Sequence, residues 1–362
     1  MSKNVSMQLA TVTKALENIP LETPAQHWAR AQKQHTAATR RRLMVSKARA
    51  AAFAMPSAAK ISTGGARHPV YRGRYCAPLE QPYDAAIKIK RLPARDDGHA
   101  WEALLNEAHV IEGLGGGHPN VVKVHTILLT PSDDLVIVME VFGGSLHDVI
   151  DGGHAPSLAD AQRVTRQILA ALAFCHTNLI LHADVKPANV LVSADGRRVA
   201  LTDFENSIRL PRTGGVRVPV FSVNPLSHQA PELLLHSSFR FEPDIWALGC
   251  LVCLLYHPAL LPGARPPFCA EAPQDQLNFI RHLSGPLPPW FAQYNRSREA
   301  AAHPVSVDYE GGWSASPQYD AEMAHIPVPV RDLVSRMLTV DWQVRPTAHT
   351  LLSDPFFYAK LE

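Results

Sequence analysis

Apolar residues in the first half of the chain recur at two different spacings. Residues 61–73 and 85–90 predict strands, the first of them with a glycine turn, and residues 135–141 predict a further apolar strand. Between these segments five apolar residues recur at helical spacing: Trp101, Leu104, Leu105, Ala108 and Ile111. The pattern predicts a sheet accompanied by one helix.

The second half carries mainly helix signals. Residues 159–176 form an amphipathic pattern, whereas Ile245 to Tyr256 are apolar on every side, as in a helix that is buried all round. This apolar run is too short to cross a bilayer, so no membrane contact is expected. The apolar triplets 190–192 and 199–201 flank the turn Ala194-Asp195-Gly196, and they predict a hairpin.

Length and composition allow one large two-lobed domain or two modest domains. The chain has 362 residues, of which 46% are hydrophobic, enough for a folded core. Five scattered cysteines suit a reducing compartment, and no apolar segment at the start resembles a secretory signal. We therefore expect an intracellular protein, in the cytoplasm and/or the nucleus. Cys250 and Cys253 lie inside the apolar run, which favours helix packing over a zinc site.

Charge divides the chain unevenly. Residues 1–60 hold ten Lys/Arg against two Glu, a net charge of +8, and the remainder holds 25 basic and 31 acidic residues, a net charge of −6. Arg40-Arg41-Arg42 with Lys47 and Arg49 could contact nucleic acid or an import receptor, or could belong to a solvated tail. We expect residues 1–57 to be a basic, flexible extension.

Ligands for phosphate chemistry concentrate around the predicted hairpin. His182-Ala183-Asp184-Val185-Lys186-Pro187-Ala188-Asn189 precedes it, and Asp203-Phe204-Glu205 follows it. Phosphoryl transfer from a metal-bound nucleotide needs a carboxylate that accepts the hydroxyl proton, a cation for the migrating phosphoryl group, and hard oxygen ligands for magnesium. The alternative interpretation is a turn with solvated acids.

These two motifs resemble the protein-kinase catalytic loop H-R-D-x-K-P-x-N and its D-F-G partner, with Ala183 and Glu205 as departures. Taken alone, they would also fit small-molecule phosphotransferases of the aminoglycoside and choline type. The resemblance implies that Asp184 orients and deprotonates a hydroxyl group and that Lys186 neutralises the transferring phosphoryl. It assigns Asn189 and Asp203 to magnesium. Lys186 at this position is similar to serine/threonine kinases.

The resemblance extends to the nucleotide site. Residues 85–90 resemble the V-A-I-K strand, so Lys88 would hold the α- and β-phosphates and pair with a helical glutamate, Glu107 rather than Glu102 or Glu112. Lys90 would lie further out on the same face. The remaining nucleotide contacts that the resemblance implies are the lid residues Gly65 and Val70, the gatekeeper Met139, the hinge residues Glu140, Val141 and Phe142, and Ala86 and Leu191.

Motifs near the C-terminus favour a protein kinase over a small-molecule phosphotransferase. Ala230-Pro231-Glu232 and Arg345-Pro346-Thr347 resemble late kinase subdomains, in which Arg345 and Glu232 form a buried pair. Residues 274–288 resemble the insert of the group that contains cyclin-dependent, mitogen-activated, dual-specificity tyrosine-regulated and Cdc2-like kinases, although Gln229 stands where this group usually has arginine.

The resemblance, over residues 58–358, implies an α+β fold of two lobes with ATP and Mg²⁺ between them. Residues 58–142 would form the small lobe and residues 143–362 the mainly helical lobe. Four departures bear on activity: Ala183, Glu205, Pro225 in place of a bracing threonine, and Thr63 and His68 in place of lid glycines. Every primary chemical group is nevertheless present. We expect a serine/threonine kinase acting on a protein substrate, with a nucleotide-binding or scaffolding pseudokinase as the alternative.

Overall fold

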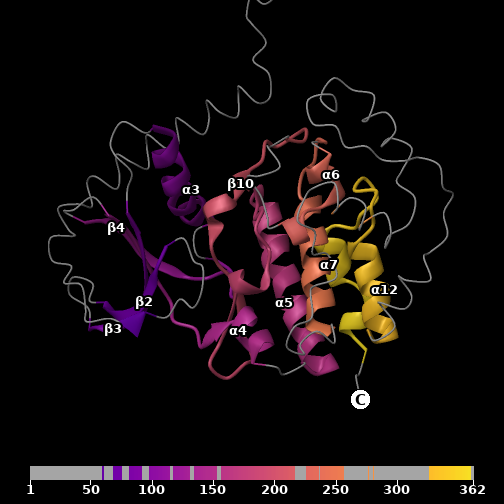
Figure 1. Ribbon diagram of the computed structural model, residues 1–362, viewed down its shortest axis with the longest axis horizontal. Helices are drawn as coiled ribbons and strands as arrows, with labels where there is room; N and C mark the ends of the chain where they lie inside the picture. The colour runs from indigo at the N-terminus through magenta and orange to yellow at the C-terminus, as the bar shows by residue number, and fades with distance from the viewer. Residues whose placement is uncertain are drawn as a thin grey trace, which may run out of the picture.

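The computed structural model describes residues 59–60, 68–75, 81–91, 98–114, 117–130, 134–152, 156–216, 226–235, 237–256, 276, 280 and 326–359. Several predictions lie outside these residues: the extension 1–57, the lid residues Thr63 and Gly65, Pro225, and most of the insert 274–288. Figure 1 shows a sheet with one helix beside a larger group of helices, which is the two-lobed α+β architecture predicted above.

The small lobe is built on five antiparallel strands in the order β1-β2-β3-β5-β4. The strands are β1 (Ala59–Lys60), β2 (Val70–Tyr75), β3 (Tyr83–Arg91), β4 (Val124–Leu129) and β5 (Asp134–Met139). Strand β3 lies in the middle, with Val70 opposite Lys88 and Met139 opposite Ala86. This central place buries the segment from Ala85 to Lys88, and the predicted strands 85–90 and 135–141 are confirmed, the second ending at Met139.

Helix α3 (Gly98–Leu114) packs beside this sheet (Figure 1). Leu105 and Ala108 form a cluster with Leu129 and Leu135 of the strands. Helix α3 also contacts η2 (Phe204–Asn206), a short turn of the large lobe. The helix therefore touches both lobes, and Glu107, one residue before Ala108, lies at their boundary.

The large lobe contains the predicted hairpin and helices. Helix α5 (Leu158–Thr177) matches the amphipathic segment, and Ser157 caps it by accepting a hydrogen bond from the Asp160 amide. The hairpin is β8 (Val190–Val192) with β9 (Val199–Leu201). The other elements are β6 (Gly144–Ser145), α4 (Leu146–Asp151), β7 (Ile180–Leu181), η1 (Pro187–Asn189), β10 (Ile208–Arg209), η4 (Leu226–His228), α6 (Pro231–Leu234), α7 (Glu242–Tyr256), α12 (Val328–Met337), α13 (Ala348–Leu352) and η6 (Pro355–Phe357).

Helix α7 is the centre of this lobe. It packs against α5 and α12, and Trp246 within it is fully buried. Cys250 and Cys253 are free thiols buried in the same helix, which confirms helix packing over a zinc site, and burial raises the pKa of Cys253 to about 12. Among the described residues no helix is both long and apolar enough to cross a membrane.

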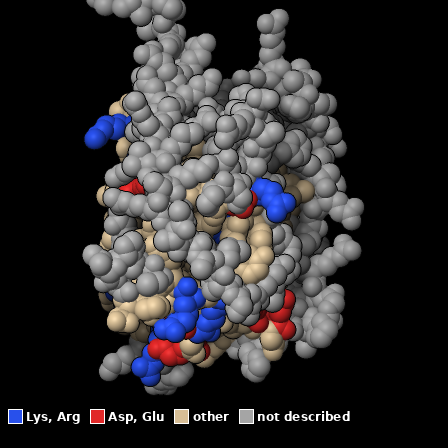
Figure 2. Space-filling view, turned by 90° about the vertical axis from the view of Figure 1, so that its left-hand side faces the viewer, with Lys and Arg blue, Asp and Glu red and all other residues tan. Residues whose placement is uncertain are grey.

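The surface of the small-lobe side carries both charge signs. In Figure 2 several Lys/Arg and Asp/Glu side chains lie side by side along the lower edge of the view, and others are scattered above them. In the small lobe an exposed pair joins β2 to β3, with Arg72 Nη2 at 3.2 Å from Asp84 Oδ2. The described part of this face therefore presents no large area of a single charge.

A buried ion pair connects the end of the large lobe to its middle. Arg345 Nη1 lies 2.6 Å from Glu232 Oε1 and its Nη2 lies 3.0 Å from Oε2, and both side chains are 0% exposed. Arg345 also donates to the carbonyls of Thr339 and Glu242. Two parallel charge-assisted hydrogen bonds offset the desolvation of both groups, as the sequence predicted.

Arg345→Met should lower the free energy of unfolding by about 3–5 kcal/mol, because it leaves the Glu232 carboxylate buried without a cation. Equilibrium denaturation by urea measures this loss. The matched control is Arg331→Met, at a half-buried arginine of α12 that has no ion pair among the described residues. The double variant Glu232→Leu with Arg345→Met should recover much of the loss, since no charge is then left buried. A single variant that melts like the wild type would contradict the prediction.

Candidate active site

Helix α7 holds the segment that carries Asp184 through hydrogen bonds. The Asp244 carboxylate accepts hydrogen bonds from the backbone amides of His182, at 2.8 Å, and Ala183, at 2.9 Å, and lies 2.9 Å from His176 Nε2. Ala183 has a φ of 62°, in the left-handed region that costs energy for a residue other than glycine. The hydrogen bonds from these two backbone amides to the buried Asp244 carboxylate hold the loop in that conformation.

The two oxygens of the Asp184 carboxylate have different surroundings. Oδ2 accepts from Lys186 Nζ at 2.9 Å, Asn189 Nδ2 at 3.0 Å and Asn206 Nδ2 at 3.2 Å. Oδ1 is buried and has no hydrogen-bond partner among the described residues. One oxygen is thus fixed by three donors, while the other is available to accept a proton from a hydroxyl group.

Asn206 was not among the predicted site residues. It lies directly after Glu205 in η2, and the described residues place its amide on Asp184. Nothing in the local sequence pattern marks this asparagine, because its partner is 22 residues away. The sequence indicates that Pro225 replaces a threonine that would brace the catalytic aspartate, and Pro225 lies outside the described residues. The contact of Asn206 with Asp184 is a brace that the structure does describe.

A buried histidine lies near the same carboxylate. His228, in η4, is within electrostatic reach of both Asp184 and Lys186. Burial lowers the pKa of His228 to about 4, an effect that Asp184 opposes and Lys186 reinforces. The imidazole is therefore neutral at pH 7 and adds no charge beside Asp184.

Asn189 and Asp203 lie on either side of the hairpin and offer oxygen atoms. Asn189 Nδ2 donates to the backbone and side-chain oxygens of Asp184, at 2.9 and 3.0 Å, which leaves its amide oxygen without a donor among the described residues. Asp203 uses Oδ1 for Lys88, and a third of its side chain is exposed. Each residue therefore has one hard oxygen ligand free, which is the donor set that Mg²⁺ takes.

Lys88 lies between the two lobes. Its Nζ is 3.0 Å from both oxygens of Glu107 and 2.7 Å from Asp203 Oδ1. Burial lowers the pKa of Lys88, but Glu107 and then Asp203 outweigh this effect and raise the pKa above its ordinary value. The lysine is therefore fully charged, and the pairing that the sequence assigned to Glu107 is present in the structure.

Lys90 is not further out, contrary to the expectation. Its side chain is 0% exposed, and its Nζ is 2.5 Å from Glu107 Oε2 and 3.0 Å from Glu205 Oε2. The reason is that Glu107 of α3 and Glu205 of η2 both contact the Lys90 ammonium group, so the second lysine is enclosed as well as the first. Spacing along a strand gives the face of the sheet but not what covers it.

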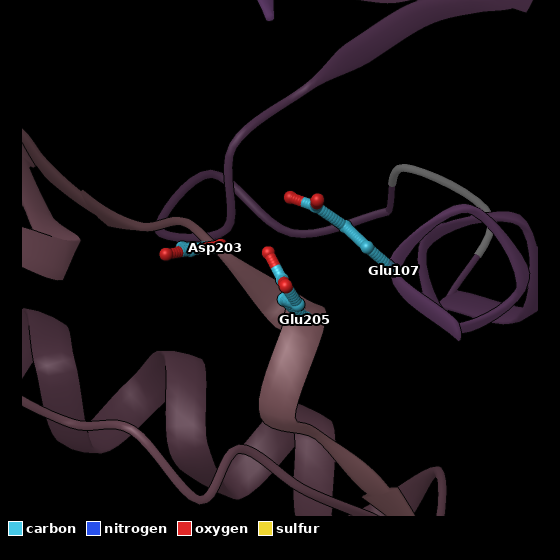
Figure 3. Close-up of side chains that lie close together, drawn as sticks. All are labelled: Glu107, Asp203 and Glu205. Carbon is cyan, nitrogen blue, oxygen red and sulfur yellow. The ribbon is translucent and has the colours of Figure 1, made fainter. Parts of the chain in front are cut away.

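Glu205, one of the four departures that bear on activity, brings a further negative charge close to Asp203. The carboxylate oxygens of Glu107, Asp203 and Glu205 do lie within 4.8 Å of one another (Figure 3), but Lys88 and Lys90 lie among them. Burial raises the pKa of Glu205, but the nearby His68 imidazole and the charges of Lys90 and Lys88 lower it well below the ordinary value. The like charge is therefore compensated.

The apolar residues assigned to the nucleotide also lie together. Ala86 and Met139 are buried in the main core, and the others are half-buried against it: Val70, Val141, Phe142 and Leu191. The Glu140 amide donates to the Lys123 carbonyl, whereas those of Val141 and Phe142 make no backbone hydrogen bond within the described part of the chain. These two amides therefore fit the contact with adenine that the sequence predicts for the hinge residues. Gly65 lies outside the described residues.

The link between the strands and the large lobe is fixed by a charged side chain. Arg198 Nη2 forms an ion pair with the Glu140 carboxylate, and its guanidinium lies 4.6 Å from the centre of the Phe142 ring. Glu140 also accepts from the Lys123 amide at 2.8 Å. The hinge is thus bonded to β4 on one side and to the β8–β9 hairpin on the other.

Comparison with known families matches residues 74–357 to the protein kinase domain. The chain belongs to the protein kinase family. Its relatives include a cyclin-dependent kinase 4 of Mus musculus, 34% identical over 178 residues, which are 48% of this chain and 55% of that protein. A calcium/calmodulin-dependent protein kinase type II of Caenorhabditis elegans is 31% identical over 272 residues, 75% of this chain and 31% of that protein.

A third relative is a mitogen-activated protein kinase 9 of Arabidopsis thaliana, 28% identical over 254 residues, 67% of this chain and 46% of that protein. The chain thus spans about half or less of the length of these relatives. Membership in the family confirms the two-lobed kinase fold and the resemblance to serine/threonine kinases. Relatives with three different names at similar identity do not select one branch.

Proposed function

We propose that the chain is an active serine/threonine protein kinase, which transfers the γ-phosphoryl group of Mg-ATP to a hydroxyl group of an intracellular protein. The observation that carries the proposal is the Asp184 carboxylate. Three donors hold one of its oxygens, and the other is buried with no partner among the described residues. A buried oxygen without a donor costs about 1–3 kcal/mol. That Oδ1 has no donor among the described residues is explained by a catalytic base and not by a scaffold.

Each residue then has a defined task in the reaction. Asp184 Oδ1 accepts the hydroxyl proton of the substrate, and Lys186, 2.9 Å from Oδ2, neutralises the negative charge of the group in transfer. Lys88 holds the α- and β-phosphates, with Glu107 behind it, and Val141 and Phe142 donate to adenine. Asn189 and Asp203 hold magnesium, which supplies charge neutralisation to the phosphate oxygens when bound.

A pseudokinase that binds nucleotide or acts as a scaffold is the second candidate. It is favoured by one observation, the bond of 2.7 Å between Lys88 Nζ and Asp203 Oδ1, since this bond occupies both a phosphate ligand and a metal ligand. Incubation with labelled ATP, magnesium, and either a generic basic protein or the chain alone separates the two. Label on protein supports the kinase; nucleotide binding without label supports the pseudokinase.

Asn206→Ala should lower the rate constant of transfer by about tenfold, because Asp184 then loses one of three donors and can rotate away from the hydroxyl group. The Michaelis constant for ATP should stay within about twofold. Steady-state kinetics at saturating magnesium measure both. The matched control is Asn178→Ala, at an asparagine whose amide bonds only the Phe174 carbonyl at the end of α5. An unchanged rate would show that Asn206 does not orient Asp184.

Phosphorylation of the activation segment is not expected to be the switch, since Ala183 leaves no arginine to pair with a phosphate. Ser207 is unsuited to test this, because its hydroxyl is buried and donates to the His182 carbonyl at 3.0 Å. The triple variant Thr213→Ala, Ser222→Ala, Ser227→Ala should therefore transfer phosphate at nearly the wild-type rate in the labelled-ATP assay. A loss of a hundredfold, about 2.7 kcal/mol, would contradict this expectation.

A further inference from the structure

Two departures from the kinase pattern lie in one charge cluster between the lobes. Glu205 stands where the pattern has glycine, and His68 stands where the lid has one. Their side chains approach to 3.5 Å, between His68 Nε2 and Glu205 Oε2. A third side chain, Lys90, contacts the same Glu205 oxygen at 3.0 Å.

The carboxylate of Glu107 is shared by two lysines. Its Oε2 lies 3.0 Å from Lys88 Nζ and 2.5 Å from Lys90 Nζ. Lys90 is 0% exposed, so no water screens its charge. A buried, unscreened cation at the shorter distance competes with Lys88 for that oxygen.

Glu205 provides the second counter-charge that this arrangement needs. The five charged groups comprise two lysines and three carboxylates: Lys88, Lys90, Glu107, Asp203 and Glu205. Lys88 is balanced by Glu107 and Asp203, and Lys90 by Glu107 and Glu205. Figure 3 shows Glu107 extending from α3 toward Asp203 and Glu205. Among the described residues, a glycine at position 205 would leave Glu107 as the only carboxylate in contact with Lys90.

The backbone around Glu205 is fixed to α3 by hydrogen bonds. Asn106 Nδ2 donates to the carbonyls of Glu205, at 2.9 Å, and Ser207, at 2.7 Å. Asn106 directly precedes Glu107 in α3. The helix therefore forms hydrogen bonds to the η2 turn through Asn106, and its next residue supplies the carboxylate that Lys88 and Lys90 share. The distance between Glu205 and Lys90 is therefore set by the fold rather than by a free side chain.

We propose that Lys90 and Glu205 are a compensating pair of positioning residues, in which Glu205 neutralises Lys90 so that Glu107 remains available to Lys88. The pair acts on the phosphate end of the nucleotide site through Glu107 and Lys88, and it does not touch the hinge. The proposal deepens the proposed function, on which its catalytic meaning rests, but its test needs binding only.

The test is a double-mutant cycle with two ligands, Mg-ATP and adenosine, each titrated by thermal shift. Glu205→Gln should weaken Mg-ATP binding about tenfold, because Lys90 then competes for Glu107, and should leave adenosine binding within about twofold. Simple electrostatics predicts the opposite sign, since removing a negative charge near the phosphates would strengthen ATP binding. Lys90→Met should also weaken Mg-ATP binding, because the half-buried Glu205 carboxylate then lacks its lysine.

The double variant Lys90→Met with Glu205→Gln should bind Mg-ATP within about threefold of the wild type, since neither the competing cation nor the carboxylate that has lost its lysine remains. The matched control breaks an exposed ion pair between β2 and β3, with Arg72→Gln and Asp84→Asn, and it should change neither affinity. If Lys90→Met does not fold, Glu205→Gln and the double variant still decide the question.

Three results with the variants would overturn the proposal. Unchanged Mg-ATP affinity in Glu205→Gln would show that Glu107 serves Lys88 without help. Equal weakening of Mg-ATP and adenosine would show that the pair only stabilises the fold. A double variant as weak as the two single losses combined would show independent effects. A wild type that binds Mg-ATP but transfers no phosphate would overturn the proposed function alone, and one that binds no Mg-ATP would overturn both.

Discussion

Asp184→Asn should abolish phosphate transfer while leaving the protein able to bind nucleotide. The amide oxygen can still accept from Lys186, but the group can no longer take a proton from a hydroxyl, so a loss of about a thousandfold or more is expected. Magnesium and ATP at about a hundred times the dissociation constant should still stabilise the fold by about 2.7 kcal/mol. Labelled-ATP transfer and thermal melts measure the two properties on the same sample.

The control for this substitution is Asp195→Asn in the turn of the β8–β9 hairpin. That carboxylate bonds only its neighbours, Ser193 Oγ at 2.6 Å and the Arg197 amide at 3.0 Å. It should change neither transfer nor the thermal shift. Full activity in Asp184→Asn would remove the central assignment of the site.

Lys88→Met should lose transfer and also weaken the thermal shift induced by magnesium and ATP. Lys88 is the cation between Glu107 and Asp203, and without it the phosphates meet carboxylates in place of an ammonium group. A loss of at least a hundredfold in catalytic efficiency is expected, about 2.7 kcal/mol. The melt without ligand is recorded first, so that a folding defect is recognised.

Lys123→Met is the matched control, since Lys123 is an exposed lysine of the small lobe with no ion pair among the described residues. Its transfer and thermal shift should equal those of the wild type. If Lys88→Met transferred phosphate normally while Lys90→Met did not, the phosphate lysine would be Lys90, and the assignment made from the Ala-x-Lys context would be wrong.

The groups carried by short motifs could be predicted from the sequence, because their chemistry and spacing are local. Asp184, Lys186 and Asn189 lie within six residues of one another, and the hairpin that brings Asp203 back is also local. The structure brings all of them together. Lys88 with Glu107 needed the further assumption that a helix packs on the strand, and that contact is present.

The contacts that the sequence did not reveal join segments far apart in the chain. Lys90 and Glu205 are separated by 115 residues, and Asn106 and Ser207 by 101. Each of these residues is polar and would ordinarily be assigned to the surface. Their burial depends on how α3 is placed against η2, which periodicity and turn signals do not specify. The sequence alone therefore counts Glu205 among the departures that bear on activity, because it does not reveal that Lys90 is the partner of Glu205.

The carboxylate of Asp244 has a consequence for the conditions under which the loop of Asp184 can open. It lies in the most enclosed helix of the large lobe, is 0% exposed, and binds the amides of His182 and Ala183. Those amides cannot exchange their hydrogens with solvent until α7 itself comes loose. The loop of Asp184 therefore shares the lifetime of the large-lobe core, and it keeps its shape through local openings of the sheet or of α3.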